Sequence, residues 1–478
     1  MKGSLLVGAL MAASVASAVS VDYVGISQLW PVSTDVRVEY RLSGTSDRPV
    51  DVTVRVFDGD TELSLDGLDS LFLKGEVYGV VGDGTHVLYL DPTKLKAQIP
   101  SYSSAFKVKV SAQEAPANAH EVIYKAVNLA NGEVTDITRA DIKNGKYGSW
   151  TDDVAKSFGL PNSLEDLLVW TGVTNDVKWA KDYMVFRKIP AGGKSFRVGA
   201  KEGSADAQIT SREKPYDVSL SADYWIGVFE VTQYQYQRLM TVNPSVFTSA
   251  ADAELHPVDN VSFGNARGGS LGLGWSAQND FETIRQVDGG TLVDKVRNLN
   301  LEKLSRLDLP SDVQWEIAAR AGVAETMYDG YFHTAATESV AASHARNLGR
   351  FSGNGGIVDN GDGTKTTNGT VRVGSYAPNQ YGLYDVLGNV AEWTGDVYME
   401  CPANQTVFPS GVDFLDPVGG LNNDDDYDGD ASNKSRSGYR GSCWIFPARN
   451  FSLSIRSKMG RTAVASYLGF RLCITEEE

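Results

Sequence analysis

Three stretches in the first quarter of the chain alternate polar and apolar residues with a period of two. They span residues 35–42, 50–57 and 106–110, and turn residues such as Gly59 separate them. Successive side chains of a β-strand face opposite sides of its sheet, so this pattern predicts half-buried strands. Several short strands at this spacing predict a β-sandwich of immunoglobulin or fibronectin type over residues 19–112.

The pattern changes over the rest of the chain. Residues 113–184 mix a strand, a turn and a weakly helical piece, and we treat them as a connector of unassigned fold. Further on, a Thr or Ser followed three residues later by Gln forms a capping box, which predicts helices at 232–242 and 312–321. A weaker helix is expected at 291–303. Residues 185–478 therefore read as an α+β domain with short strands, many loops and little regular structure.

The N-terminus has the features of a secretory signal over residues 1–18. Lys2 supplies a positive charge, an apolar run begins at Leu5, and residues 16–18 read Ala-Ser-Ala, which fits the small-x-small cleavage rule. A short N-terminal core helix is the alternative. The apolar run is too short to span a bilayer, and the rest of the chain has no apolar run of 18 residues. We expect a secreted or periplasmic protein without a membrane span.

The charge of the chain argues against two classes of partner. It has 44 basic and 60 acidic residues and a net charge of −16. Binding to nucleic acid requires clustered positive charge, and anionic membrane surfaces repel an acidic protein. A nucleic-acid partner is therefore not expected.

Seven segments of the C-terminal domain together resemble one known family. In order, they are IPAG at 189–192, WIGVFEVT at 225–232, HPVDNVSF at 256–263, LPSDVQWEIAAR at 309–320, YGLYDVLGNVAEW at 381–393, YRGSCW at 439–444 and LGFRL at 468–472. In this order and spacing they resemble the formylglycine-generating enzyme (sulfatase-modifying factor) family. The resemblance implies an α+β fold related to C-type lectins, with bound calcium.

A first calcium site is implied within residues 381–393. Two carboxylates seven residues apart flank a Gly-Asn turn, and Ca²⁺ prefers carboxylate and carbonyl oxygens. A turn held only by its own hydrogen bonds is the alternative. The positions matching the family's ligands are Asp385, Gly388, Val390 and Glu392.

Two further acidic loops are weaker candidates. A second family calcium site would use Asn347 and Leu348, with Asp362 as the best guess for its other half. Residues 424–430 match the first half of an EF-hand loop, but position 12 would be Ser435 instead of Glu. We interpret that loop as solvated.

The copper chemistry of the family lacks its ligands here. The resemblance implies an O₂-dependent oxidase in which two cysteines hold copper(I), a soft ion that requires thiolates. The matching positions are Phe446 and Phe451, so copper is not expected. Cys443 replaces the serine before the aromatic residue of the family's motif. Cys443 and Cys473 are the preferred disulfide pair, since both fall in what reads as one terminal sheet region, and a buried free thiol is the alternative.

The same region matches the family's substrate-binding surface. Aromatic, aliphatic and arginine side chains mixed on a loop-rich surface are typical of a recognition face, although core packing explains about half of them equally well. The residues expected to form this face are Trp444, Phe446, Arg449, Phe451 and Arg456.

Three functions remain open from the sequence. The first, which we favour, is a calcium-stabilised recognition module for a protein, peptide or glycan. The second is an oxidase that converts a sulfatase cysteine to formylglycine, which Phe446 and Phe451 oppose. The third is an inactive factor that binds sulfatases, or a diversified ligand-binding protein. Retention of copper would separate the second from the others.

Overall fold

The computed structural model describes residues 19–28, 32–46, 48–98, 105–160, 167–201, 215–268, 287–332, 337–397, 414–415 and 436–476. The signal expected at 1–18, Cys401 and the acidic loop at 424–430 lie outside these residues. The chain divides into two compact units. The first comprises Met1–Glu121 and Thr138–Ser149, and the second comprises Val122–Ile137 and Trp150–Glu478.

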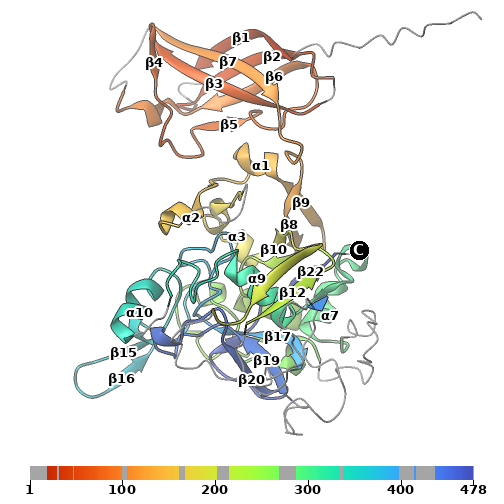
Figure 1. Ribbon diagram of the computed structural model, residues 1–478, viewed down its shortest axis with the longest axis vertical. Coiled ribbons are helices and arrows are strands. Elements are labelled where there is room, and N and C mark those ends of the chain that lie inside the picture. Colours follow the sequence, from red (N-terminus) through yellow and green to blue (C-terminus); the bar gives the residue numbers. More distant parts are fainter. Residues whose placement is uncertain are drawn as a thin grey trace, which may run out of the picture. The chain divides into compact units, whose positions relative to one another are not determined.

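The first unit contains two antiparallel sheets, red to orange in Figure 1, with strand orders β1-β2-β6-β5 and β4-β3-β7. Along β2 and β3 alternate side chains are buried, as the period-two pattern predicts. Tyr40, Val54 and Leu88 belong to one core that both sheets share. The immunoglobulin or fibronectin type stays a prediction. The elements are β1 (Ser20–Gln28), β2 (Val36–Ser43), β3 (Val50–Asp58), β4 (Thr61–Leu63), β5 (Leu73–Gly75), β6 (Gly84–Leu90), η1 (Pro92–Leu95), β7 (Phe106–Glu114) and α1 (Arg139–Lys143).

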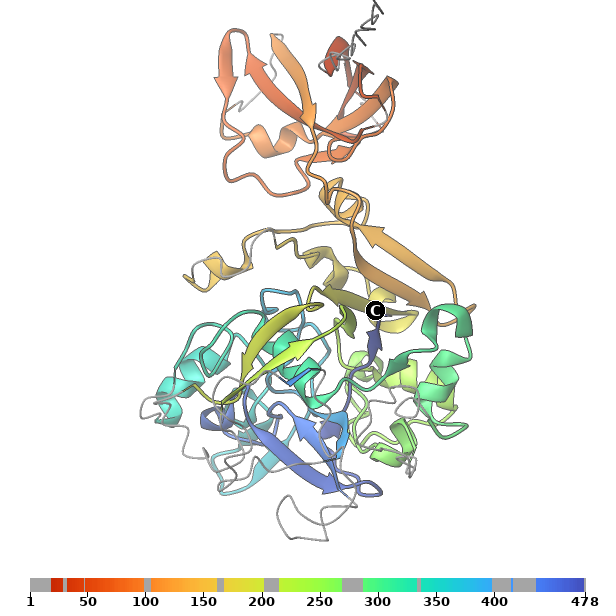
Figure 2. The ribbon, with the colours of Figure 1, turned by 45° about the vertical axis from the view of Figure 1, so that its right-hand side comes forward.

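The second unit is built on a six-stranded sheet with strand order β14-β22-β13-β10-β8-β9. Its strands come from distant parts of the sequence, and Figure 2 shows the C-terminal strand β22 in blue ending in this sheet. The segment that the sequence left unassigned supplies two of the strands. The bounds are β8 (Val122–Asn128), β9 (Val134–Thr138), β10 (Tyr183–Ile189), β13 (Tyr224–Gly227), β14 (Leu307–Asp308) and β22 (Cys473–Thr475).

Three smaller sheets contain the other strands that the structure describes in this unit. Their orders are β11-β12-β18, β20-β19-β17-β21 and β15-β16. The bounds are β11 (Lys194–Val198), β12 (Tyr216–Leu220), β15 (Ile357–Asp359), β16 (Lys365–Thr367), β17 (Ala391–Val397), β18 (Phe414–Leu415), β19 (Arg436–Arg440), β20 (Arg456–Gly460) and β21 (Leu468–Gly469). The unit is thus mixed and strand-rich with short helices, consistent with the expected α+β class.

Both capping boxes are formed. Thr232 accepts a hydrogen bond from the Gln235 N–H at the start of α4, and Ser311 accepts one from Gln314 at the start of α9. The weaker helix expected at 291–303 is two short helices, α7 and α8. The bounds are α2 (Val154–Ser157), η2 (Thr171–Thr174), α3 (Lys178–Lys181), α4 (Gln233–Met240), η4 (Ala253–Leu255), α5 (Phe263–Ala266), α7 (Leu292–Arg297), α8 (Leu301–Leu304), α9 (Asp312–Arg320), α10 (Glu338–Ala345), η5 (Ser352–Asn354) and η7 (Ala448–Asn450).

Side chains are buried on both faces of the six-stranded sheet. Tyr224 and Ile226 of β13 join a buried cluster that includes Trp315 of α9, here called the α9 cluster. Trp225, between them, joins a second cluster that includes Val293 of α7, the α7 cluster. Because successive side chains of a strand face opposite sides, the sheet separates the two clusters.

Candidate functional site

The candidate site is the recognition segment, residues 443–456, which follows β19. Neighbouring elements hold it through its main chain. The Trp444 N–H donates to the Asn389 carbonyl at 2.9 Å, and the Phe446 carbonyl accepts the Ser352 N–H at 3.0 Å. Glu338, the first residue of α10, accepts the N–H groups of Ala448 and Arg449 at 2.8 and 3.1 Å. These bonds use only main-chain groups of the recognition segment, so they fix its backbone independently of its side chains.

Only part of the expected face is exposed. Arg449 is exposed and Phe446 is half-buried, as a recognition face requires. Trp444, Phe451 and Arg456 were also expected there, but they are 3%, 0% and 8% exposed. These three assignments are corrected, because their side chains pack inward. Ile445, at 37% exposure, is the better surface residue.

The inward side chains have identifiable partners. Trp444 donates from Nε1 to the Ser466 carbonyl at 2.9 Å. Phe451 packs against Phe351 with ring centroids 5.8 Å apart. Arg456 forms an ion pair with Asp312 at 2.9 Å. A sequence pattern cannot separate these residues from surface ones, because the segment has no regular period.

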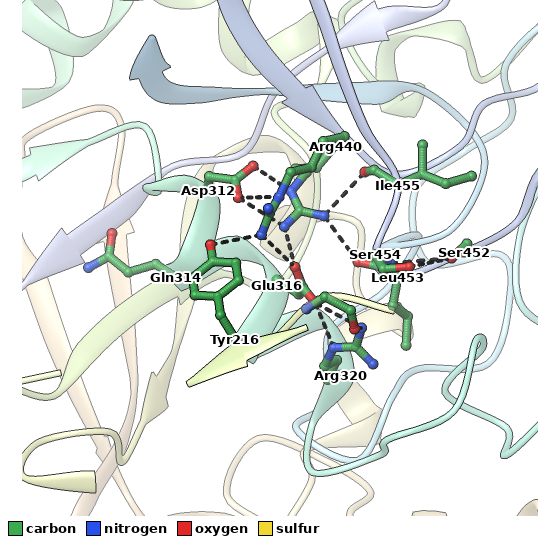
Figure 3. Close-up of polar contacts among 12 residues, drawn as sticks. Tyr216, Asp312, Gln314, Glu316, Arg320, Arg440, Ser452, Leu453, Ser454 and Ile455 are labelled. Carbon is green, nitrogen blue, oxygen red and sulfur yellow. Dashed lines mark hydrogen bonds and ion pairs between the residues drawn. The ribbon is translucent and has the colours of Figure 1, made fainter. Parts of the chain in front are cut away.

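A buried ion network supports the end of the segment (Figure 3). Arg440 binds Asp312 of α9 at 2.6 Å and also contacts Glu316. The same guanidinium donates to the Leu453 and Ile455 carbonyls, both at 3.2 Å. Arg440 thereby fixes the backbone that follows η7. Charge-assisted hydrogen bonds of this kind are among the stronger ones in proteins.

Glu316 is the centre of the network's negative charge. It is 0% exposed, and it also binds Arg320 at 2.8 Å. Burial by itself would raise the pKa of Glu316. The positive charges of Arg440, Arg320 and Arg456 outweigh this effect and hold the pKa well below its usual range. Burial raises the pKa of the neighbouring Tyr216 to about 12. Glu316 is therefore ionised and paired, which is a structural role.

The first expected calcium site fits a cation in part. Asp385 is fully buried, and its backbone is left-handed with φ 56°. Its Oδ2 accepts the Gly374 N–H at 2.6 Å, whereas Oδ1 has no hydrogen-bond partner. Burial raises the pKa of Asp385 to about 7. A buried carboxylate oxygen without a donor suits a Ca²⁺ ligand, so Asp385 fits the group that the resemblance implies.

Glu392 does not fit this role. Arg471 donates to both of its carboxylate oxygens at 2.6 and 2.7 Å, and Trp315 donates to it at 2.7 Å. Its charge is thus balanced and its oxygens are occupied. Within the described part of the chain, no three His, Cys, Asp or Glu side chains converge as a metal centre would require.

The sequence reasoning missed Glu230, which lies beside this loop. It is 1% exposed, and its oxygens accept the Val390 N–H at 3.0 Å and the Asn389 side-chain amide at 2.7 Å. Burial first, and then the charges of Asp385 and Glu392, raise its pKa well above the usual range. The sequence signal that could have identified Glu230 was its position in the WIGVFEVT segment. Gly388, also expected as a ligand, turns the loop with φ 92°.

The residues of the second expected calcium site have hydrogen-bond partners within the protein. The Asn347 carbonyl accepts the Ala377 N–H at 2.9 Å, and the Leu348 carbonyl accepts the Tyr328 hydroxyl at 2.9 Å. Asp362 is exposed and accepts the Thr364 N–H at 2.9 Å within its own turn. Asp362 therefore stays a prediction as a calcium ligand.

The expected disulfide is not formed. Cys443 and Cys473 are free and buried. Cys443 belongs to the α7 cluster and Cys473 to the α9 cluster, so the two thiols lie in cores on opposite faces of the six-stranded sheet. Burial raises the pKa of Cys443 to about 12 and that of Cys473 well above its usual range.

The second unit is an α+β domain with short strands, and hydrogen bonds to its main chain hold the recognition segment in place. A known domain family matches this part of the chain. The family described as Sulfatase-modifying factor enzyme 1-like domain matches residues 182–476. The chain belongs to this family. The resemblance seen in the seven sequence segments is thus confirmed.

Individual relatives match smaller parts of the chain. The formylglycine-generating enzyme of Thermomonospora curvata is 36% identical over 88 residues, which are 18% of this chain and 26% of that enzyme. The match therefore spans about a quarter of that enzyme's own length. Chaperone protein LppX of Paenibacillus barcinonensis is 30% identical over 238 residues, covering 45% of this chain and 78% of that protein. The solved structure of Treponema denticola variable protein 1 aligns with 22% identity and a TM-score of 0.42, covering 62% of this chain and 96% of that one.

Proposed function

We propose that this protein is a recognition module of the sulfatase-modifying-factor family that binds a protein, peptide or glycan and does not oxidise cysteine. The observation that carries the proposal is the identity and packing of Phe446 and Phe451 at the positions of the family's copper cysteines. A phenyl ring offers copper(I) no thiolate. Phe451 is also completely buried against Phe351, which leaves no room for a metal centre there.

The remaining described thiols do not replace the lost ligands. The thiolate, not the thiol, binds a metal, and burial raises the pKa of both Cys443 and Cys473 so far that they stay protonated near neutral pH. They also belong to different core clusters.

The backbone of the recognition segment supports a binding role. Contacts from Asn389, Ser352 and Glu338 order the segment before any ligand arrives. Pre-ordering lowers the entropy cost of association. Ile445, Phe446 and Arg449 then present apolar, aromatic and cationic surface side by side along the chain, a mixture that is common at binding hot spots.

Two further parts of the proposal concern location and calcium. The signal-like residues 1–18 support export to the periplasm or the exterior. Among the described residues, no helix has the length and apolar character needed to cross a bilayer.

The unpartnered Oδ1 of Asp385 supports a Ca²⁺ ion at the 385–390 loop, where Asp385 would be the acidic ligand and the ion would add structural rigidity.

Loading with copper tests the central claim. Purified protein lacking residues 1–18 is incubated with copper(I), desalted, and mixed with a cysteine-bearing sulfatase peptide under oxygen. We expect no retained copper, no oxygen uptake and no mass shift of the peptide. Copper retention with conversion to formylglycine would overturn the recognition proposal. A Cys401→Ser variant is run in parallel to show whether that thiol contributes, and an active formylglycine-generating enzyme serves as the positive control.

A chaperone-like role is the second candidate, because the relative that aligns over 238 residues is named a chaperone protein. In this case the recognition segment binds a partly folded enzyme. A purified sulfatase diluted from urea should aggregate less in the presence of the wild-type protein. The double variant Phe446→Ala, Arg449→Ala should lose this effect if the segment binds the sulfatase. Equal aggregation with and without the wild-type protein would eliminate the candidate.

A further inference from the structure

A tightly held loop borders the recognition segment. Thr241, with φ 63°, ends helix α4, and the chain continues through residues 242–247, here called the rim loop. Val246 of this loop is 54% exposed. The half-buried Phe247 packs edge-on against Trp444, the second residue of the recognition segment, with ring centroids 5.0 Å apart. The position of the rim loop therefore shapes one edge of the recognition segment.

Side chains from outside the loop fix its backbone. Oδ1 of Asp259 accepts the Val246 N–H at 2.8 Å. Asn260 donates to the Pro244 carbonyl at 3.0 Å, and Gln233 of α4 donates to the Phe247 carbonyl at 3.0 Å. Asp259 is the one ionisable group of these three side chains, so it alone makes the attachment sensitive to pH.

The surroundings of Asp259 disfavour its ionised form. The side chain is 0% exposed, and Oδ2 has no hydrogen-bond partner. Burial raises the pKa of Asp259 to about 7, although the Val246 and Phe247 N–H groups oppose this. A buried carboxylate without sufficient donors or a counter-ion is costly, so the proton stays on to a higher pH than in water.

The hydrogen-bond partners of Asp259 on the rim loop are neutral. The Ser245 hydroxyl accepts the Asp259 N–H at 3.2 Å, and the neutral amide of Gln233 in α4 donates to the Phe247 carbonyl of the same loop. On its own segment, His256 bonds to Thr370 and Asp252, and burial lowers the pKa of His256. Within the described residues, no salt bridge includes Asp259.

We propose that Asp259 is a proton-controlled latch whose neutral carboxyl holds the rim loop against Trp444. The ionised carboxylate accepts the Val246 N–H more strongly, but its charge is buried and its Oδ2 has no partner, so ionisation favours an opened loop in which water reaches Oδ2. This inference rests on the proposed recognition function, because the latch would regulate the edge of the recognition segment at Trp444. Because the folded carboxyl is harder to ionise than a free one, the stability that it contributes is complete below pH about 4. That contribution is lost as the pH rises toward about 7 and does not change further above it. The recognition edge is thus most ordered in mildly acidic surroundings.

Hydrogen exchange tests the latch without any ligand. The full-length mature protein is exchanged at pH 5, 6, 7 and 8, and the protection of peptides covering residues 242–248 is corrected for the intrinsic exchange rate. We expect protection to fall by up to about tenfold per pH unit between pH 5 and 7 and then to level off. Asp259→Asn keeps an oxygen for the Val246 N–H but cannot ionise, so its profile should be flat. Glu302→Gln, a change at an exposed acid of α8, should keep the wild-type profile.

Two results would overturn the latch. One is wild-type protection that does not vary with pH, and the other is the wild-type profile in Asp259→Asn. If Asp259→Asn fails to fold, Asp259→Ser provides a smaller neutral acceptor and must give the same flat profile. Neither result bears on copper or ligand binding, so a failed latch leaves the proposed function standing. Conversely, copper-dependent turnover would remove the function without altering the exchange data.

Discussion

Two phenylalanines five residues apart show how one segment serves both the core and the surface. Phe451 is completely buried in the α9 cluster, whereas Phe446 is half-buried and contacts Tyr467 with ring centroids 6.0 Å apart. Both lie at positions where the resemblance implies a family cysteine, but only Phe446 keeps area that a ligand can touch. Their different burial predicts different roles.

Truncating each ring separates these roles. Phe451→Ala should cost about 3–5 kcal/mol of unfolding free energy, because it leaves a cavity in a closed core. Phe446→Ala should cost about 1 kcal/mol and impair binding instead. Urea unfolding of both variants measures the difference. A loss for Phe446→Ala as large as that for Phe451→Ala would place Phe446 in the core and remove it from the recognition face.

Helix α9 is the element that connects the core to the recognition segment. The helix is buried along most of its length, including Trp315 and Ile317, and it also carries Asp312 and Glu316, which bind Arg440. Arg440 in turn holds the Leu453 and Ile455 carbonyls. Fraying at the start of α9 would therefore reach the recognition segment through Asp312, the first helical residue.

Removing the cap of α9 tests this connection. Ser311→Ala deletes the hydroxyl that accepts the Gln314 N–H at 3.1 Å and should cost about 1 kcal/mol. Hydrogen exchange in peptides covering 451–456 should also become faster, because Asp312 is held less firmly. Ser311→Asp, which restores a capping oxygen, is the matched control and should recover both values. Unchanged exchange in 451–456 after Ser311→Ala would show that the segment is held independently of α9.

At the scale of the whole molecule, calcium should stabilise the second unit. Ca²⁺ that binds only the folded state raises stability by about 2.7 kcal/mol at a hundred times its Kd. Thermal unfolding with millimolar Ca²⁺ and with a chelator should therefore give a higher and a lower midpoint. Asp385→Ala should abolish the difference. The left-handed backbone of Asp385 adds strain to Ala, but this lowers both midpoints equally.

The matched control for calcium is Glu392→Gln. Because Arg471 and Trp315 occupy the Glu392 oxygens, this variant should be less stable but should keep its response to calcium. A wild-type midpoint that is the same with calcium and with chelator would contradict the calcium proposal.

Local sequence patterns determined those features that depend on neighbouring residues. The capping boxes at Thr232 and Ser311 located two helix starts, because a cap is made within one helical turn. The alternating residues in β2 and β3 predicted strands for the same reason. Seven ordered segments were sufficient to indicate the family, because their order and spacing are carried by the chain itself.

Only the tertiary structure decided which groups meet. Arg471 pairs with Glu392 across 79 residues, and Glu230 meets Asn389 across 159. These contacts change which acids of the 385–392 region are available to a cation. The two cysteines were separated by the sheet between them, and three of five expected face residues turned inward. Ion pairing and burial depend on long-range packing, which no local pattern records, and so the site needed the fold to be defined.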